Sequence, residues 1–228
     1  FPYPPRFRSD SIDAGAGDNV VLGDDGELDF AGGVLVEALS TDTETGGDDQ
    51  VTASGGRDVV VGGLGADTLS AGDGANVLIG DSAELSFSGG LLASAVSLDP
   101  ADGGIDTITG GAGDDVIVGG VGGDTIDAGE GNNVVLGDDG EADFSDGVVT
   151  HVASADVALG GDDQVTAGTG RDVVVGGAGD DSLSAGDGAN VLVGDSAEAF
   201  FAAGSAQLLS VASEAGLNDG DDAITGGA

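Results

Sequence analysis

The chain has 228 residues, with 47 Gly, 43 Asp or Glu and four Lys or Arg, so its formal net charge is −39. This charge excludes nucleic acid as an expected partner, and the absence of cysteine excludes a disulfide framework or a thiolate metal site. No apolar run approaches the roughly 18 residues that a membrane span requires. Val, Leu and Ile nevertheless recur at fixed spacing, which indicates a folded chain with bound cations and not a disordered acidic tail.

Residues 1–8, FPYPPRFR, differ in chemistry from everything that follows. They hold three of the four prolines and the only tyrosine, and this composition favours an extended, polyproline-like segment. The segment is either a linker remnant or an arm, Phe1–Arg8, that docks on the acidic body of a neighbouring copy. Because the chain begins with Phe1 and not Met, it is expected to be a processed product or part of a longer protein.

From Ser9 onward the chain repeats with a period of 57 residues, and Asn recurs at positions 19, 76, 133 and 190. The repeat region, 9–228, divides into units of about 9–43, 44–100, 101–157 and 158–228. Each unit contains an excursion without the glycine rhythm of the rest; the excursions cover 23–43, 80–100, 137–157 and 194–216.

Gly-Gly or Asp-Gly pairs between apolar runs predict a β-hairpin in the excursions. Phenylalanines at matching positions are expected to pack the hairpin bases against the rest of the molecule; they are Phe30, Phe87, Phe144 and Phe201. The sequence leaves open whether the hairpins interrupt the repeat structure or decorate it.

The rest of each unit consists of nine-residue words of the form G-G-x-G-x-D-x-U-x, where U is a large apolar residue. Residues 62–79 show two of them, GGLGADTLS and AGDGANVLI. The glycines permit a tight turn and the apolar residue begins a short strand.

This word resembles the calcium-binding nonapeptide of RTX proteins. The resemblance implies an all-β fold, a right-handed parallel β-roll or β-solenoid with calcium between successive turns, here with four units that each carry a protruding hairpin. It also implies type I secretion and an extracellular location, secreted or on the cell surface.

Two words make one coil of such a roll, so the sixth-position residues should form two ladders along its edges. The candidate metal ligands are Asp10, Asn19, Asp49, Asp58, Asp67, Asn76, Asp106, Asp115, Asp124, Asn133, Asp163, Asp172, Asp181, Asn190 and Asp222. Because Asn offers only a neutral oxygen, sites beside an excursion should bind more weakly or use Asp24, Asp81, Asp138 and Asp195 instead. Oxygen ligands of this kind favour multiple Ca²⁺ ions over zinc or copper.

The eighth positions predict a stripe of buried apolar residues; they are Ile12, Val21, Val51, Val60, Leu69, Leu78, Ile108, Ile117, Ile126, Val135, Val165, Val174, Leu183, Leu192 and Ile224. A core built from this stripe alone would be about one side chain thick. Such a core should not withstand carboxylate repulsion without metal, so folding and calcium binding are expected to be one event.

No catalytic site is predicted, and the chain is not expected to be an enzyme. The only histidine, His151, is expected on the surface of a hairpin. Paired carboxylates such as Asp114 and Asp115 recur along the chain, whereas an active site needs one constellation in one pocket.

Uniform repeats with one distinctive arm favour a structural protein. The expected function is a calcium-dependent extracellular solenoid that assembles head to tail, as a homo-oligomer, into a filament or matrix. Two alternatives stay open: a stalk segment of a giant RTX adhesin, and the C-terminal secretion and folding module of an exported enzyme.

Overall fold

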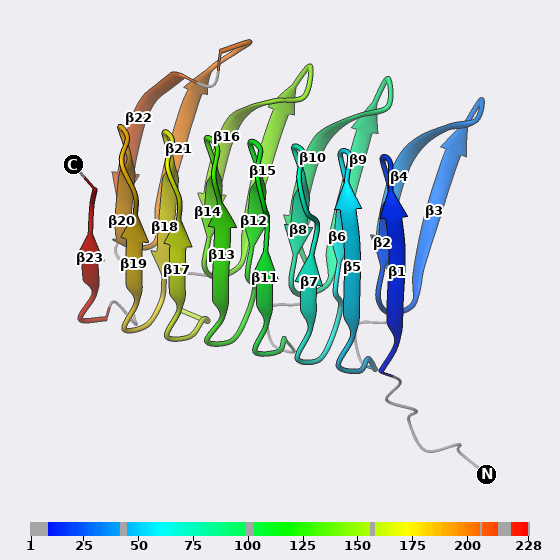
Figure 1. Cartoon of the computed structure of the whole chain (residues 1–228), viewed down its shortest axis with the longest axis horizontal. Helices are drawn as coiled ribbons and strands as arrows, with labels where there is room; N and C mark the ends of the chain where they lie inside the picture. The colour runs from blue at the N-terminus through cyan, green and yellow to red at the C-terminus, as the bar shows by residue number, and fades with distance from the viewer. Residues whose placement is uncertain are drawn as a thin grey trace.

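The computed structural model describes residues 9–41, 45–98, 103–155, 158–205, 207–213 and 220–227. These residues form 23 β-strands joined by turns, and they fall into three sheets, named here A, B and C. Figure 1 shows the sheets as stacked layers, with sheet A in front and the long hairpins of sheet C behind. None of the described residues belongs to a helix with the length and apolarity to cross a membrane.

Sheets A and B are parallel and form the roll, because the chain alternates between them. Sheet A contains β1 (Ser11–Ala16), β5 (Gln50–Gly55), β7 (Thr68–Ser70), β11 (Thr107–Thr109), β13 (Thr125–Gly129), β17 (Gln164–Ala167), β19 (Ser182–Ala185) and β23 (Ala223–Thr225). Sheet B contains β2 (Val20–Leu22), β6 (Val59–Val61), β8 (Val77–Ile79), β12 (Val116–Val118), β14 (Val134–Leu136), β18 (Val173–Gly177) and β20 (Val191–Asp195). Followed from N to C in Figure 1, the coil is right-handed. The predicted all-β roll is therefore confirmed.

Strand pairing is uninterrupted from one end of the roll to the other. Within one unit the apolar eighth positions pair directly, as in Ile108 with Ile126. Across an excursion they pair in the same way, as in Leu69 with Ile108 and Val21 with Val60. The hairpins therefore leave the roll without interrupting it.

The excursions form the predicted hairpins, but these do not protrude separately. They join edge to edge into the antiparallel sheet C, in which β4 pairs with β9, β10 with β15 and β16 with β21. The strands are β3 (Gly26–Ala31), β4 (Val34–Ser40), β9 (Ala83–Ser88), β10 (Leu91–Ser97), β15 (Gly140–Ser145), β16 (Val148–Ser154), β21 (Ala197–Ala202) and β22 (Gln207–Ser213). A lone hairpin is marginal in water, and edge-to-edge pairing removes that weakness.

The described residues form two hydrophobic cores. The first lies between sheets A and B and contains the predicted eighth-position stripe, with Val51, Ile108 and Ile117 fully buried. Ile224, also predicted in the stripe, is instead 50% exposed, because it lies on the end strand β23. The second lies between sheets B and C and includes Val61, Ile79 and Leu85. It exists because sheet B is covered on both faces, which calls for continuously apolar strands. The first core was predicted from the sequence, and the second was missed.

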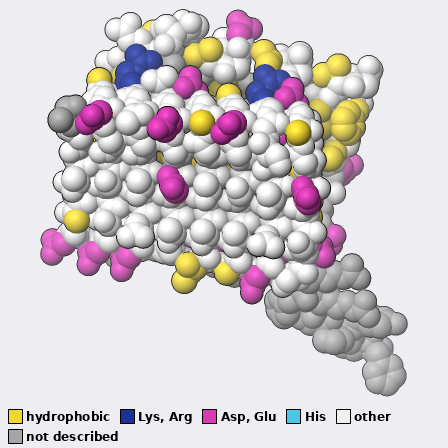
Figure 2. Space-filling view, in the orientation of Figure 1, with side chains coloured by type: hydrophobic (Ala, Val, Ile, Leu, Met, Phe, Trp, Pro, Cys, Tyr) yellow, Lys and Arg dark blue, Asp and Glu magenta, His cyan; other side chains and the backbone are white. Residues whose placement is uncertain are grey.

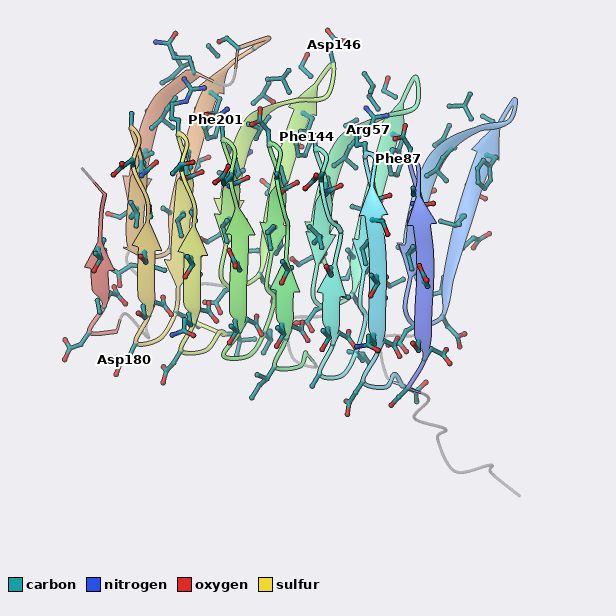
Figure 3. All side chains as sticks on the ribbon, viewed as in Figure 1. Arg57, Phe87, Phe144, Asp146, Asp180 and Phe201 are labelled. Atoms are coloured by element: carbon teal, nitrogen blue, oxygen red, sulfur yellow. The ribbon has the colours of Figure 1, made fainter. Side chains whose placement is uncertain are left out.

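The hairpin phenylalanines pack into this second core near the hairpin turns and not at the hairpin bases. Phe201 is buried, and Phe87 and Phe144 pack partly buried against the same cluster; Figure 3 labels all three. Phe30 departs from this pattern, with 61% of its surface exposed. It lies on β3, the outermost strand of sheet C, where no further hairpin covers it among the described residues.

Candidate metal centres

The sixth-position residues lie in the turns along the two edges of the roll, as the sequence predicted. The lower edge in Figure 3, marked by Asp180, holds the turns that enter sheet A. Its sixth positions are all Asp; they are Asp10, Asp49, Asp67, Asp106, Asp124, Asp163, Asp181 and Asp222. The upper edge, marked by Arg57, holds the turns that enter sheet B. Its sixth positions alternate; they are Asn19, Asp58, Asn76, Asp115, Asn133, Asp172 and Asn190.

Hydrogen bonds connect the members of each ladder. The backbone N–H of each sixth residue donates to Oδ1 of the sixth residue in the next coil. The bond is 2.8 Å from Asp106 to Asp124 within a unit and 2.7 Å from Asp67 to Asp106 across an excursion. On the upper edge it is 3.0 Å from Asp115 to Asn133. One oxygen of each side chain is therefore used to hold successive coils in register.

The second oxygen of the buried Asp residues has no such bond. Among the described residues, Oδ2 is buried without a hydrogen-bond partner in nine of them; these are Asp49, Asp58, Asp67, Asp106, Asp115, Asp124, Asp163, Asp172 and Asp181. A buried carboxylate oxygen without a partner is strongly unfavourable unless a cation or a proton neutralises it. Nine instances in one geometry indicate a repeated site and not an isolated defect.

Glycine keeps space open beside seven of these nine oxygens, all except those of Asp58 and Asp172. A Cβ added at Gly62 would overlap Oδ2 of Asp67 and the carbonyl oxygen of Gly80 in the next coil. The first-position glycine of other words faces the same pair of atoms, as at Gly119, where the pair comes from Asp124 and Gly137. Carboxylate and main-chain oxygens thus converge on one point in each of these seven turns.

Hard cations with six to eight oxygen ligands, above all calcium, match this donor set. Within the described ranges, no three His, Cys, Asp or Glu side chains gather in a group that could hold a metal. The side chains would therefore supply a minority of the ligands and the turn carbonyls the majority.

The electrostatics of the lower edge also require a cation or a proton. Burial, with a smaller contribution from neighbouring carboxylates, raises the pKa of Asp67 and Asp106 to about 8. Burial likewise raises the pKa of Asp163 to about 10, with Asp138, Asp124 and Asp181 close enough to repel it. On the upper edge, burial raises the pKa of Asp115 to about 6. Without metal, many of the Asp carboxylates on the folded lower edge would be protonated at neutral pH.

Asp24, Asp81 and Asp138 are placed differently from the ladder residues. Oδ1 of Asp81 accepts the N–H of Gly104 at 3.0 Å and its Oδ2 accepts the N–H of Val121 at 2.6 Å. Asp138 and Asp24 likewise accept backbone N–H groups of the turns beside them. These carboxylates clamp the base of each hairpin to the next coil. Asp195, the last residue of β20, holds the corresponding sequence position.

A further ladder lies at the fifth positions and was not predicted. Oδ1 of Asp48 accepts the N–H of Ala66 at 3.0 Å, and Oδ1 of Asp162 accepts the N–H of Asp180 at 2.9 Å. The Asp-Asp pairs in the sequence were the available signal. The first Asp of a pair serves the outer fifth-position ladder and the second serves the buried sixth-position ladder.

His151 lies on sheet C, as predicted, but it is enclosed by neighbouring groups. Its Nε2 lies 3.1 Å from Glu198 and its Nδ1 lies 3.4 Å from Asp143. Its ring stacks on Phe200 with 4.7 Å between ring centroids. The contacts with Glu198 and Phe200, both on β21, tie the third hairpin to the fourth.

Comparison with protein families identifies the repeat. A model of the RTX calcium-binding nonapeptide repeat matches the chain in four copies, at residues 8–27, 45–82, 101–135 and 157–196, which together make up more than half of it. The chain belongs to the RTX family. Comparison with curated proteins and with solved structures gave no match.

RTX nonapeptide repeats bind Ca²⁺, and the buried Asp oxygens of this chain fit several such ions. The RTX roll is a structural calcium-binding domain of a kind found in secreted bacterial proteins. The sixth-position Asp residues are the ones whose chemistry would hold the metal.

Proposed function

We propose that this chain is an extracellular structural protein whose RTX roll closes on calcium and then stacks end to end. The observation that carries the proposal is the row of buried Asp Oδ2 atoms without partners along both edges. A chain of net charge −39 cannot keep these groups ionised in a compact state without counter-ions. Calcium binding is therefore expected to supply the folding free energy.

Calcium concentration would then act as the folding signal. Extracellular calcium modules have dissociation constants of roughly 10⁻⁴ to 10⁻³ M, so sites of this class stay empty at the low calcium of a cell interior. They fill at the millimolar calcium outside. Export through a type I channel in an unfolded state is consistent with this order of events.

The free edges of the sheets favour stacking of copies. One end of the described molecule exposes β1, β2 and β3, and the other exposes β23, β20 and β22 (Figure 1). Unpaired strand edges are templates for further pairing. In a stack, β23 of one copy would pair in parallel with β1 of the next, and β22 would pair antiparallel with β3. This pairing continues the pattern of sheets A and C.

Exposed apolar residues also lie on these end strands. Phe30 on β3 is 61% exposed and Leu209 on β22 is 66% exposed. Stacking would bring the two end strands of sheet C together and cover both side chains, which favours association. The proposed arm, Phe1–Arg8, lies outside the described residues.

Negative-stain electron microscopy in millimolar calcium, and again after chelator, tests this function. Filaments that form in calcium and dissolve in chelator are the expected result. Deletion of residues 1–8 should shorten or abolish them, while the roll itself still folds. Single short rods in calcium would contradict assembly and favour a stalk segment or a secretion module.

A further inference from the structure

The upper edge alternates Asn with Asp, whereas the lower edge is Asp throughout. We infer that Asn19, Asn76, Asn133 and Asn190 are not calcium ligands but replace the cation, so that alternate turns of the upper edge close without metal. The inference rests on the proposed calcium-dependent closure at the Asp turns. It assigns the calcium sites to all turns of one edge and to every second turn of the other.

The buried Asn residues use their single amide oxygen to accept the ladder hydrogen bond. Oδ1 of Asn76 accepts the backbone N–H of Asp58 at 3.0 Å, and Oδ1 of Asn133 accepts that of Asp115 at 3.0 Å. Both side chains are almost fully buried, with 1% and 0% of the residue exposed. The ladder bond therefore fixes the orientation of the amide.

Because Oδ1 is held in the ladder, the other end of the side chain points into the turn. An Asp in this position presents Oδ2, but an Asn presents the NH₂ group, which is a donor and cannot bind a cation. Rotating the amide to offer its oxygen would place the NH₂ group against the N–H of the neighbouring coil. Two donors would face each other in a buried site, which is unfavourable.

The NH₂ group donates hydrogen bonds to the turn carbonyl oxygens that a metal would otherwise need as ligands. Nδ2 of Asn76 donates to the carbonyl oxygens of Gly72 and Gly74, both at 3.2 Å. Nδ2 of Asn190 donates to the carbonyl oxygen of Gly186 at 2.8 Å. The same bond joins Asn133 to Gly129 at 3.2 Å. The amide thus supplies hydrogen bonds to carbonyl oxygens of its own turn.

The amide also stabilises the Asp beside it in the ladder. Nδ2 of Asn19 donates to Oδ1 of Asp58 at 2.7 Å, and Asn76 makes a side-chain hydrogen bond to Asp115. Each upper-edge Asp therefore lies between neutral amides, whereas each internal lower-edge Asp lies between two further sixth-position carboxylates. On removal of calcium, the lower edge should open while the Asn turns keep their hydrogen bonds.

Counting bound calcium in matched variants tests the assignment. Wild type, Asn133→Asp, Asn133→Ala, Asp115→Asn and the surface control Asn132→Ala would be dialysed to equilibrium in saturating calcium, with far-UV circular dichroism to confirm folding. Relative to wild type, Asn133→Asp should bind about one ion more and Asp115→Asn about one fewer. Asn133→Ala and Asn132→Ala should bind the wild-type number.

The results that would overturn the inference differ from the result that would refute the proposed function. Loss of an ion from Asn133→Ala, or an unchanged count with tighter binding in Asn133→Asp, would show that the amide is a ligand and overturn the inference. If Asn133→Ala does not fold, the counts for Asn133→Asp and Asp115→Asn still decide between the two assignments. A wild-type chain that binds no calcium would instead refute the proposed function.

Discussion

Acid should fold this chain in the absence of calcium. The buried Asp residues ionise near 3.8 in the unfolded chain, but burial raises the pKa of Asp67 to about 8 and that of Asp115 to about 6. When the folded pKa lies above the unfolded one, stability is fully present below the unfolded value and is lost as pH rises through the folded value. Protons would therefore replace calcium on the acidic side.

The expected effect is large enough to decide between the folded and unfolded states. At pH 5, a group with a folded pKa of about 6 contributes about 1.4 kcal/mol, and one with a pKa of about 8 contributes about 4 kcal/mol. At pH 8 the first contribution is close to zero and the second is below about 1 kcal/mol. Domains are stable by only about 5–15 kcal/mol, so a few such groups are enough to shift the equilibrium.

The assay is far-UV circular dichroism of metal-free protein, prepared by passage over a chelating resin, at pH 8, 6.5 and 5. Dilute samples are needed because the sequence pI is about 4.1 and solubility falls as net charge approaches zero. We expect coil at pH 8 and β-structure at pH 5. A metal-free chain that is as unfolded at pH 5 as at pH 8 would refute the argument from buried carboxylates.

Two further predictions concern the coils and the second core. In millimolar calcium, Gly74→Ala should destabilise the roll by several kcal/mol, because its Cβ would overlap a carbonyl oxygen of the preceding coil at a φ of +143°. Gly32→Ala, at a φ of +63° in open space, should cost only about 1 kcal/mol; equal losses in urea melts would contradict the stacking. Val118→Thr should lower the free energy of unfolding by about 1–3 kcal/mol because it buries a hydroxyl between sheets B and C. The exposed reverse change, Thr109→Val, should stay within about 0.5 kcal/mol, and a Val118→Thr variant as stable as wild type would argue against the second core.

The sequence predicted the roll and its edges well because both depend on local spacing. Glycines at fixed positions determine the turns, and one apolar residue per word determines the first core. The hairpins were also predictable: Gly32 and Gly33 have φ values of +63° and +82°, as do, within a few degrees, Gly89 and Gly90. Such paired positive φ angles are what a two-residue hairpin turn requires.

The second core escaped prediction because the eighth position alone was followed. The strand words VVV and VLI of sheet B are apolar at every position, whereas TLS and TIT of sheet A are not. That difference indicates which sheet is covered on both faces. The association of the hairpins into one sheet was less accessible, because it depends on pairing between segments 43 or more residues apart, as in Ser97 with Gly140.

Composition and spacing also could not predict the separate role of Asn within the ladders. Asp and Asn occupy the same position of the word, and only the direction of the ladder bond shows that Asn turns its NH₂ group inward. The hairpin clamps formed by Asp81 and Asp138 depend in the same way on which backbone N–H groups the fold brings near them.

The central claim is that the roll closes because calcium neutralises buried carboxylates. Its most direct test is a calcium titration of the metal-free chain at pH 7.5, followed by far-UV circular dichroism and reversed with chelator. We predict a cooperative gain of β-structure in the range of roughly 10⁻⁴ to 10⁻³ M calcium, with full loss on chelation. A chain already β-structured in chelator, with a spectrum that calcium does not change, would contradict it.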